Sequence, residues 1–227
     1  MILITGASKG IGKFLFRKFS ETGELVYGTY FSGKPIEGKE TFFSKVNVSN
    51  YQEIADWIES IQGNLENIVL LNCAGGNYNS FAHKADVVKW SELININLVG
   101  TFNVIHEVLP LMREQKYGRI INFSSIVAQM GIPGTSAYAA SKSGMWGMSK
   151  SIAVENASKG ITINNLNLGY FDVGMISDVP LKFQEIIKAK IPTRDFGNPE
   201  NIYRAVRFLI ETDYINGTSV DINAGLF

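Results

Sequence analysis

The sequence predicts an α/β fold, in which one doubly wound domain spans residues 1–227. About seven strands form its central parallel sheet, and helices cover both faces. Two observations predict this fold. Short apolar runs alternate with stretches of helical periodicity, the pattern of repeated β-α-β units around a parallel sheet. The length of 227 residues suits one such domain, and no repeat, linker or low-complexity segment divides it.

The predicted elements follow in chain order. Strands are expected at 1–5, 25–30, within 41–48, and at 67–72, 118–124, 161–168 and 218–223. Between them, helical spacing predicts helices from about Ile11 to Gly23, after Ser49, over 86–115, over 135–158, within 180–192 and after Asn198-Pro199-Glu200. Ser49 and Gln52 form an S-x-x-Q capping box that opens the second helix. The long helical region 86–115 contains an expected break near Asn95–Asn97.

Composition excludes several classes of protein. The 21 basic and 21 acidic residues balance and are scattered, which disfavours nucleic-acid binding. No apolar run approaches the roughly 20 residues of a membrane span, and the start MILITGAS lacks the basic region of a signal peptide. Cys73 is the only cysteine, so we expect no intrachain disulfide and a cytoplasmic location. With two histidines and one cysteine, we expect no metal site.

The stretch TGASKGIG at 5–12 follows the first strand and opens the first helix. Its glycines, Gly6, Gly10 and Gly12, let a backbone approach a pyrophosphate, and the helix start supplies amide groups for the anion. This context favours a dinucleotide site of the Rossmann type. The alternative is a tight turn that merely requires glycine.

The second strand indicates which dinucleotide is bound. An acidic residue at its end would favour NAD, but none occurs from Leu25 to Ile36. Thr29 and Ser32 offer hydroxyls there. Lys9 and Lys34 offer positive charge, unless both are simply solvated. The sequence therefore predicts NADPH, with NAD disfavoured.

Tyr138 stands four residues before Lys142, so one helix can place both on the same face. A lysine close to a phenol favours the phenolate, and we expect Lys142 to lower the pKa of Tyr138 toward a useful range. Tyr30 and Lys34 form a second pair at this spacing, but Gly33 and Pro35 break a helix there. The side chains of this second pair therefore do not share one helical face.

These motifs together resemble the short-chain dehydrogenase/reductase family over essentially the whole chain. The family's T-G-x-x-x-G-x-G corresponds to 5–12 and its Y-x-x-x-K to Tyr138 and Lys142. The resemblance implies that Ser125, thirteen residues before the tyrosine, is the catalytic serine, and not its neighbour Ser124. It also implies that Asn97 anchors a proton-relay water.

The resemblance further implies a cofactor site formed along the carboxyl edge of the sheet. Asn72-Cys73-Ala74-Gly75 stands where the family has N-N-A-G, and Leu168-Gly169 where it has P-G. Val173 replaces a threonine that often binds the nicotinamide carboxamide, so backbone groups such as those of Phe171 and Val173 are expected to bind there. The implied cofactor residues are Gly6, Ser8, Lys9, Gly10, Ile11, Gly12, Thr29, Asn47, Val48, Asn72, Cys73, Ala74, Gly75, Tyr138, Lys142, Gly169, Phe171 and Val173.

Within the family, the chain is most similar to the 3-oxoacyl-[acyl-carrier-protein] reductases. That likeness implies a ketone substrate on a thioester and places Lys116 and Lys159 as candidate contacts for the carrier protein near the active-site mouth. It also implies a homotetramer, formed through the helices at 86–115 and 135–158, with NAGLF (223–227) at a second interface. The helix within 180–192 would cover the substrate.

Three alternatives stay open at this stage. The chain could reduce a specialised ketone, such as a sugar or a secondary metabolite. It could be a regulator that binds a dinucleotide without catalysis. A hydrolase pairing Ser125 with His83 or His106 is the weakest alternative, because Ser125 does not stand in a G-x-S-x-G motif.

Overall fold

In the computed structural model, which describes residues 1–226, one sheet of seven parallel strands forms the centre of the molecule. The strand order is β3-β2-β1-β4-β5-β6-β7. The strands are β1 (Ile2–Thr5), β2 (Val26–Tyr30), β3 (Phe43–Lys45), β4 (Val69–Asn72), β5 (Gly118–Ser125), β6 (Ile161–Leu168) and β7 (Ser219–Ile222). The parallel sheet confirms the predicted α/β class. Strands β1 and β4 are neighbours, and the strand order reverses between them, as in a doubly wound sheet.

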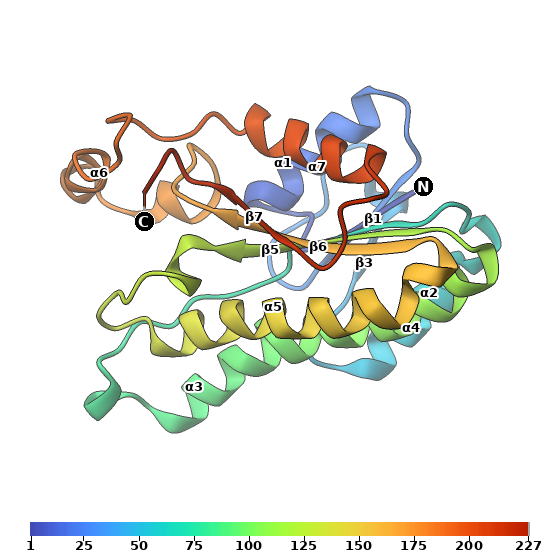
Figure 1. Cartoon of the computed structure of the whole chain (residues 1–227), viewed down its shortest axis with the longest axis horizontal. Coiled ribbons are helices and arrows are strands. Elements are labelled where there is room, and N and C mark those ends of the chain that lie inside the picture. Colours follow the sequence, from blue (N-terminus) through green and yellow to red (C-terminus); the bar gives the residue numbers. More distant parts are fainter. Residues whose placement is uncertain (227) are drawn as a thin grey trace.

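Helices cover both faces of this sheet (Figure 1). They are α1 (Gly10–Glu21), α2 (Tyr51–Ile61), α3 (Val87–Ile94), α4 (Gly100–Gln115), α5 (Ser136–Asn156), α6 (Leu181–Lys188) and α7 (Glu200–Glu211). Helices α1 and α7 lie on one face, and α2, α4 and α5 lie on the other (Figure 1). Within the described residues, no helix combines the length and the apolar character that crossing a membrane requires.

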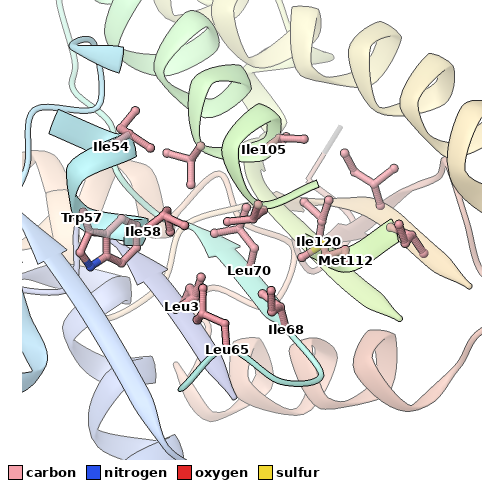
Figure 2. Close-up of a cluster of buried hydrophobic side chains, with 14 of the residues drawn as sticks. Leu3, Ile54, Trp57, Ile58, Leu65, Ile68, Leu70, Ile105, Met112 and Ile120 are labelled. Carbon is pink, nitrogen blue, oxygen red and sulfur yellow. The ribbon is translucent and has the colours of Figure 1, made fainter. Parts of the chain in front are cut away.

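Two apolar cores hold the layers together, one on each face of the sheet. Leu3, Leu70 and Ile120 point toward α2 and α4, where they meet Ile54 and Ile105 (Figure 2). The other core packs α1 and α7 against alternate residues of the same strands. The most central strands, β1 and β4, are buried on both faces, and their sequences are therefore continuously apolar.

The start of α2 differs from the prediction by one residue. Asn50, and not Ser49, is the N-cap, and its Oδ1 accepts a hydrogen bond from the Gln52 amide at 3.1 Å. Its Nδ2 donates to Glu53 at 2.9 Å, so the side chains that cooperate at this helix start are Asn50 and Glu53. Ser49 Oγ is buried without a hydrogen-bond partner. The predicted Ser49–Gln52 box is therefore wrong.

The predicted interruption of the long helical region is a π-helical turn. Residues Asn95–Val99 join α3 to α4 without ending the helix. A π-turn contains one more residue than an α-helical turn, and such turns are frequent at functional sites. The backbone hydrogen-bonding pattern thus changes from α-helical to π-helical around Asn97, which is completely buried.

Candidate active site

The candidate site lies at the carboxyl ends of β1, β4, β5 and β6, where an open parallel sheet binds its ligands. In Figure 1 this is the end of the sheet near α6 and the amino-terminal turn of α5. Ser125 is the last residue of β5, and Tyr138 and Lys142 occupy the first two turns of α5.

The glycine loop between β1 and α1 has the geometry of a phosphate cradle. Gly6 and Gly10 both have positive φ, +66° and +56°, a region that side chains rarely adopt. A Cβ on Gly12 would lie 2.4 Å from the backbone oxygen of Gly6, so only glycine fits. Helix α1 starts without a side-chain cap or an acid in its first turn. Its first amides therefore suit a pyrophosphate, and the residues present fit a bound dinucleotide.

The end of β2 changes one prediction about the cofactor. Thr29 is buried, and its Oγ1 accepts a hydrogen bond from the Gly6 amide at 3.3 Å. Thr29 therefore supports the glycine loop, and the prediction that its hydroxyl faces the cofactor is wrong. The exposed hydroxyl is that of Ser32, which accepts a hydrogen bond from Lys9 Nζ at 3.3 Å. Ser8 donates to the Ser32 backbone oxygen at 3.1 Å, so these side chains form one cluster.

The residues implied along β3 and β4 act through backbone or packing. Asn72 is buried and donates to Asn122 at 2.8 Å, so its side chain points into the protein. The Ala74 amide donates to Thr5 Oγ1 at 3.0 Å, which ties the loop after β4 to the end of β1. Cys73 is half-buried, and desolvation raises the pKa of its thiol, which makes the thiol unreactive. Val48 is likewise buried in the core below the site.

The segment after β6 is expected to bind the cofactor through its backbone. Gly169 packs so closely on Asn223 that a Cβ would lie 2.8 Å from the Asn223 Cα. Phe171 is buried, and its backbone oxygen accepts a hydrogen bond from the Val173 amide at 2.7 Å. The Val173 amide is therefore already engaged, and the expected binding of a carboxamide by backbone groups of Phe171 and Val173 stays a prediction.

The two central hydroxyls of the site contact each other. The Ser125 hydroxyl lies close enough to the Tyr138 phenol to act on its pKa, and the Val127 amide donates to Ser125 Oγ at 3.2 Å. Burial raises the pKa of Tyr138, the Ser125 hydrogen bond opposes this, and the nearby Tyr170 adds to it. Tyr138 therefore keeps its proton at neutral pH, which is the state that a general acid needs.

Lys142 is close to this tyrosine but does not lower its pKa in this structure. Its Nζ lies 5.6 Å from the centre of the Tyr138 ring and donates to the Phe123 backbone oxygen at 2.7 Å. Burial lowers the pKa of Lys142 itself to about 8, and Cys73 slightly opposes this. The prediction that Lys142 tunes Tyr138 downward is wrong here, because desolvation acts on both groups more strongly than their mutual attraction.

Asn97 lies beside the same lysine. A Cβ on Gly75 would be 3.1 Å from Asn97 Oδ1 and 3.9 Å from Lys142 Nζ. Asn97 Oδ1 accepts from the Gly76 amide at 2.8 Å, and its Nδ2 donates to Ser141 Oγ at 3.1 Å. Asn97 therefore links the loop after β4 to α5.

Sequence reasoning missed two residues of the site. Ser141 is fully buried and donates to the Tyr138 backbone oxygen at 2.8 Å, so it connects Asn97 to the turn of α5 that carries Tyr138. Its signal was only its place inside Y-A-A-S-K. Tyr170 brings a second phenol near Tyr138, and no motif indicated it.

Neither histidine accompanies Ser125. His106 lies on α4, with its ring 5.7 Å from that of Tyr51, and His83 lies 6.2 Å from the ring of Phe81. The serine's side-chain partner is a tyrosine, which disfavours the hydrolase alternative. Within residues 1–226, the His, Cys, Asp and Glu side chains form no group of three that could hold a metal.

The model of the family described as short chain dehydrogenase matches residues 1–182 of this chain. The chain belongs to this family. Members of the short chain dehydrogenase family are oxidoreductases that bind a nicotinamide dinucleotide.

Relatives within the short chain dehydrogenase family match over nearly the full length. An acetoacetyl-CoA reductase of Shinella zoogloeoides is 37% identical over 99% of this chain and 97% of its own. One of Rhizobium meliloti is 36% identical with the same coverage. A 3-oxoacyl-[acyl-carrier-protein] reductase of Staphylococcus epidermidis is 32% identical over 99% of this chain and 98% of its own.

A solved structure shares the fold of this short chain dehydrogenase. It is a protein of Agrobacterium tumefaciens, provisionally assigned as a gluconate dehydrogenase, and it superposes with a TM-score of 0.90. The match covers all of this chain and 95% of the other at 21% identity, so it establishes the fold alone.

The two lysines predicted as carrier-protein contacts lie far from the site. Lys116 caps the carboxyl end of α4 and Lys159 follows α5, both just before the first residues of β5 and β6. Ser125 is at the other end of the eight-residue β5, about 25 Å away by strand rise. Their predicted place near this chain's own active-site mouth is therefore wrong.

Proposed function

We propose that this short chain dehydrogenase is an NADPH-dependent reductase that converts the ketone of a 3-oxoacyl thioester to a secondary alcohol. The observation that carries the proposal is the placement of Tyr138 next to Ser125 and Lys142, at the same sheet edge as the glycine cradle. A protonated phenol beside a serine hydroxyl can act as the acid that protonates the alkoxide formed from a ketone. The protonated state of Tyr138 therefore favours reduction over oxidation.

In the proposed reaction, a bound nicotinamide would supply the hydride. Ser125 Oγ would donate a hydrogen bond to the ketone oxygen and orient it. The Tyr138 hydroxyl would then give its proton to that oxygen as negative charge develops. Lys142, whose pKa is about 8, can exchange a proton at neutral pH and so assist the return of the tyrosine to its protonated state.

The preference for NADPH rests on the end of β2. Lys9 Nζ and the Ser32 hydroxyl are 3.3 Å apart, and this part of the chain has no acid from Leu25 to Ile36. A cation with a neighbouring hydroxyl suits a ribose 2′-phosphate, whereas NAD-binding sites generally carry an acid here. Lys34, exposed nearby, adds charge to the same edge.

The substrate class comes from the names of the relatives, which act on acetoacetyl-CoA or on 3-oxoacyl groups of acyl carrier protein. Exposed apolar side chains on α6, Leu181, Phe183 and Ile186, support an acyl substrate, if this helix covers the site as the sequence predicts. A specialised ketone is the rival. Lys116 and Lys159 do not support a carrier at this chain's own site.

A homotetramer and a cytoplasmic location complete the proposal. Val99, just before α4, and Phe102, on α4, are exposed, and Val154 on α5 is 84% exposed, so both predicted interface helices carry apolar surface. The predicted second interface reaches Phe227, which lies outside the described residues. Gel filtration of a monomer would contradict the assembly.

The test follows NADPH oxidation with acetoacetyl-CoA, beside NADH and beside Tyr138→Phe. We expect turnover with NADPH to fall by orders of magnitude in the variant while NADPH binding persists. Tyr117→Phe is the matched control, because that tyrosine lies at the opposite end of β5. Near-normal turnover by Tyr138→Phe refutes the mechanism, and turnover with a sugar ketone but not the thioester favours the rival.

A further inference from the structure

Three polar side chains stand side by side across β5, β6 and β7, one residue before the catalytic end of β5. Ser124 pairs in register with Asn167, and Asn167 pairs with Asp221. Paired residues of parallel neighbours point to the same face of a sheet. Here the face is that of α5, because Trp146 of this helix contacts two of the three. We name Ser124, Asn167 and Asp221 the polar row.

The hydrogen bonds of the row form a continuous, satisfied chain. Trp146 Nε1 donates to Ser124 Oγ at 3.1 Å and to Asn167 Oδ1 at 3.0 Å. Asn167 Nδ2 donates to Asp221 at 2.8 Å. Gln129 Nε2 donates to both oxygens of the same carboxylate, at 3.0 and 3.1 Å. Each donor meets an acceptor, so the row has one self-consistent arrangement.

The row connects directly to the catalytic groups. Ser124 Oγ donates to the backbone oxygen of Lys142 at 3.2 Å, while Lys142 Nζ donates to the Phe123 oxygen at 2.7 Å. Strand β5 and one turn of α5 are thus fastened at two adjacent residues. Gln129, which holds the outer end of the row, lies four residues after Ser125. The strand and the loop that flank the catalytic serine are therefore both attached to the row.

Apolar packing alone does not fix this helix against the sheet. Four of the eight buried residues of α5 are polar: Ser141, Lys142, Ser149 and Asn156. Apolar contacts tolerate small shifts, whereas hydrogen bonds depend on direction and distance. The polar contacts therefore decide the register of α5 over β5 and β6.

We propose that Ser124 and Trp146 are positioning residues, which set the register of α5 and hence hold Lys142 and Tyr138 against Ser125. The expected effect on turnover rests on the proposed function. The expected effect on dinucleotide binding, through the position of Lys142, does not. Displacing catalytic groups by about 1 Å costs roughly a hundredfold in rate. The row thus acts on turnover through Lys142 and Tyr138 without touching substrate.

The chain offers a matched control one helical turn further on. Ser149 Oγ donates to Asn165 at 2.9 Å and accepts from Asn122 at 3.1 Å, and the side chain is fully buried. Ser149→Ala removes hydrogen bonds of the same kind from the same helix face. It does so away from Lys142, so a merely structural role predicts equal effects of Ser149→Ala and Ser124→Ala.

The experiment compares Ser124→Ala, Trp146→Phe and Ser149→Ala in the full chain. Four quantities are measured: thermal stability, the Kd of NADPH from the cofactor's own fluorescence, and kcat and KM with acetoacetyl-CoA. We expect similar losses of Tm in the two serine variants. We expect kcat to fall roughly tenfold or more, and the Kd of NADPH to rise about threefold or more, only in Ser124→Ala and Trp146→Phe. The KM for the ketone should stay within about twofold of the unmutated value.

Effects on kcat and Kd that match those of Ser149→Ala overturn the proposal. If the unmutated protein reduces no ketone, the proposed function fails, and the Kd of NADPH alone tests the positioning role. A rise confined to Ser124→Ala and Trp146→Phe supports that role, and an equal rise in Ser149→Ala refutes it. If Ser124→Ala does not fold, Trp146→Phe, which keeps an aromatic ring in place, decides between the two results.

Discussion

Replacing Lys142 by methionine should stabilise the ligand-free protein while it abolishes turnover. Lys142 is buried, and burial lowers its pKa from 10.5 to about 8. Among the described residues, its ammonium makes one hydrogen bond, to the Phe123 backbone oxygen at 2.7 Å. Methionine keeps an unbranched side chain of similar size and removes the buried charge.

The size of the effect follows from the two pKa values. The interval from 10.5 to about 8 corresponds to roughly 3 kcal/mol of destabilisation of the charged form. Loss of the hydrogen bond to Phe123 costs about 1 kcal/mol. The net gain is about 2 kcal/mol, which raises the Tm of a chain of this length by about 4–8 °C at pH 7.

The pH dependence gives the prediction a second readout. Because the folded pKa of Lys142 is the lower one, the unfolded chain binds more protons between about pH 8 and 10.5. The stability of the unmutated protein therefore rises through this window relative to Lys142→Met, and the advantage of the variant shrinks. Comparing the two proteins largely cancels other groups, such as Cys73, whose pKa burial raises.

The assay is thermal unfolding of both ligand-free proteins at pH 7 and near pH 10, beside NADPH oxidation with acetoacetyl-CoA. A variant that is less stable than the unmutated protein at pH 7, or whose advantage does not shrink with pH, refutes the reasoning. Lys150→Met, on the same helix but exposed, controls for removal of a charge alone.

Three further predictions concern the loop, the cofactor and a helix start. Lys9→Ala should lower kcat/KM for NADPH by about tenfold and leave that for NADH within about twofold, because it removes the cation proposed to bind the 2′-phosphate. Equal losses with NADPH and NADH would show that Lys9 does not bind this phosphate. Gly12→Ala should lower Tm and abolish NADPH binding, since its Cβ would lie 2.4 Å from a backbone oxygen, whereas Gly63→Ala, in open space, should do neither. Asn50→Ala should lower the free energy of unfolding in urea by about 1 kcal/mol as a lost N-cap, and Ser49→Ala should not, because its hydroxyl has no partner.

The strands and long helices could be predicted because burial leaves a local pattern. β1 and β4 are buried on both faces and read as continuous apolar runs. Helix α2 shows its buried Ile54, Trp57 and Ile58 at helical spacing. The N-cap could not be chosen, since Ser49 and Asn50 are neighbouring capping residues and only the folded backbone decides between them.

The site was predictable where motifs place residues on known elements, and less so where burial or distance decides. Ser125 and Tyr138 meet as expected. Thr29 was misassigned because its exposure depends on how the glycine loop folds back over β2. The predicted position of Lys116 and Lys159 beside this chain's own site was wrong, because the resemblance did not take into account that both residues precede their strands.

The π-helical turn at Asn95–Val99 constrains the length of the chain at this point. One extra residue there rotates everything after it by about 100° relative to a regular helix. Deleting a single residue from the turn would restore regular hydrogen bonding, yet it would turn Asn97 away from Gly76 and Ser141, its partners at 2.8 and 3.1 Å. Substitutions that keep the length of the chain should therefore be tolerated in this turn. A one-residue deletion should give a more regular helix that no longer hydrogen bonds with the loop after β4.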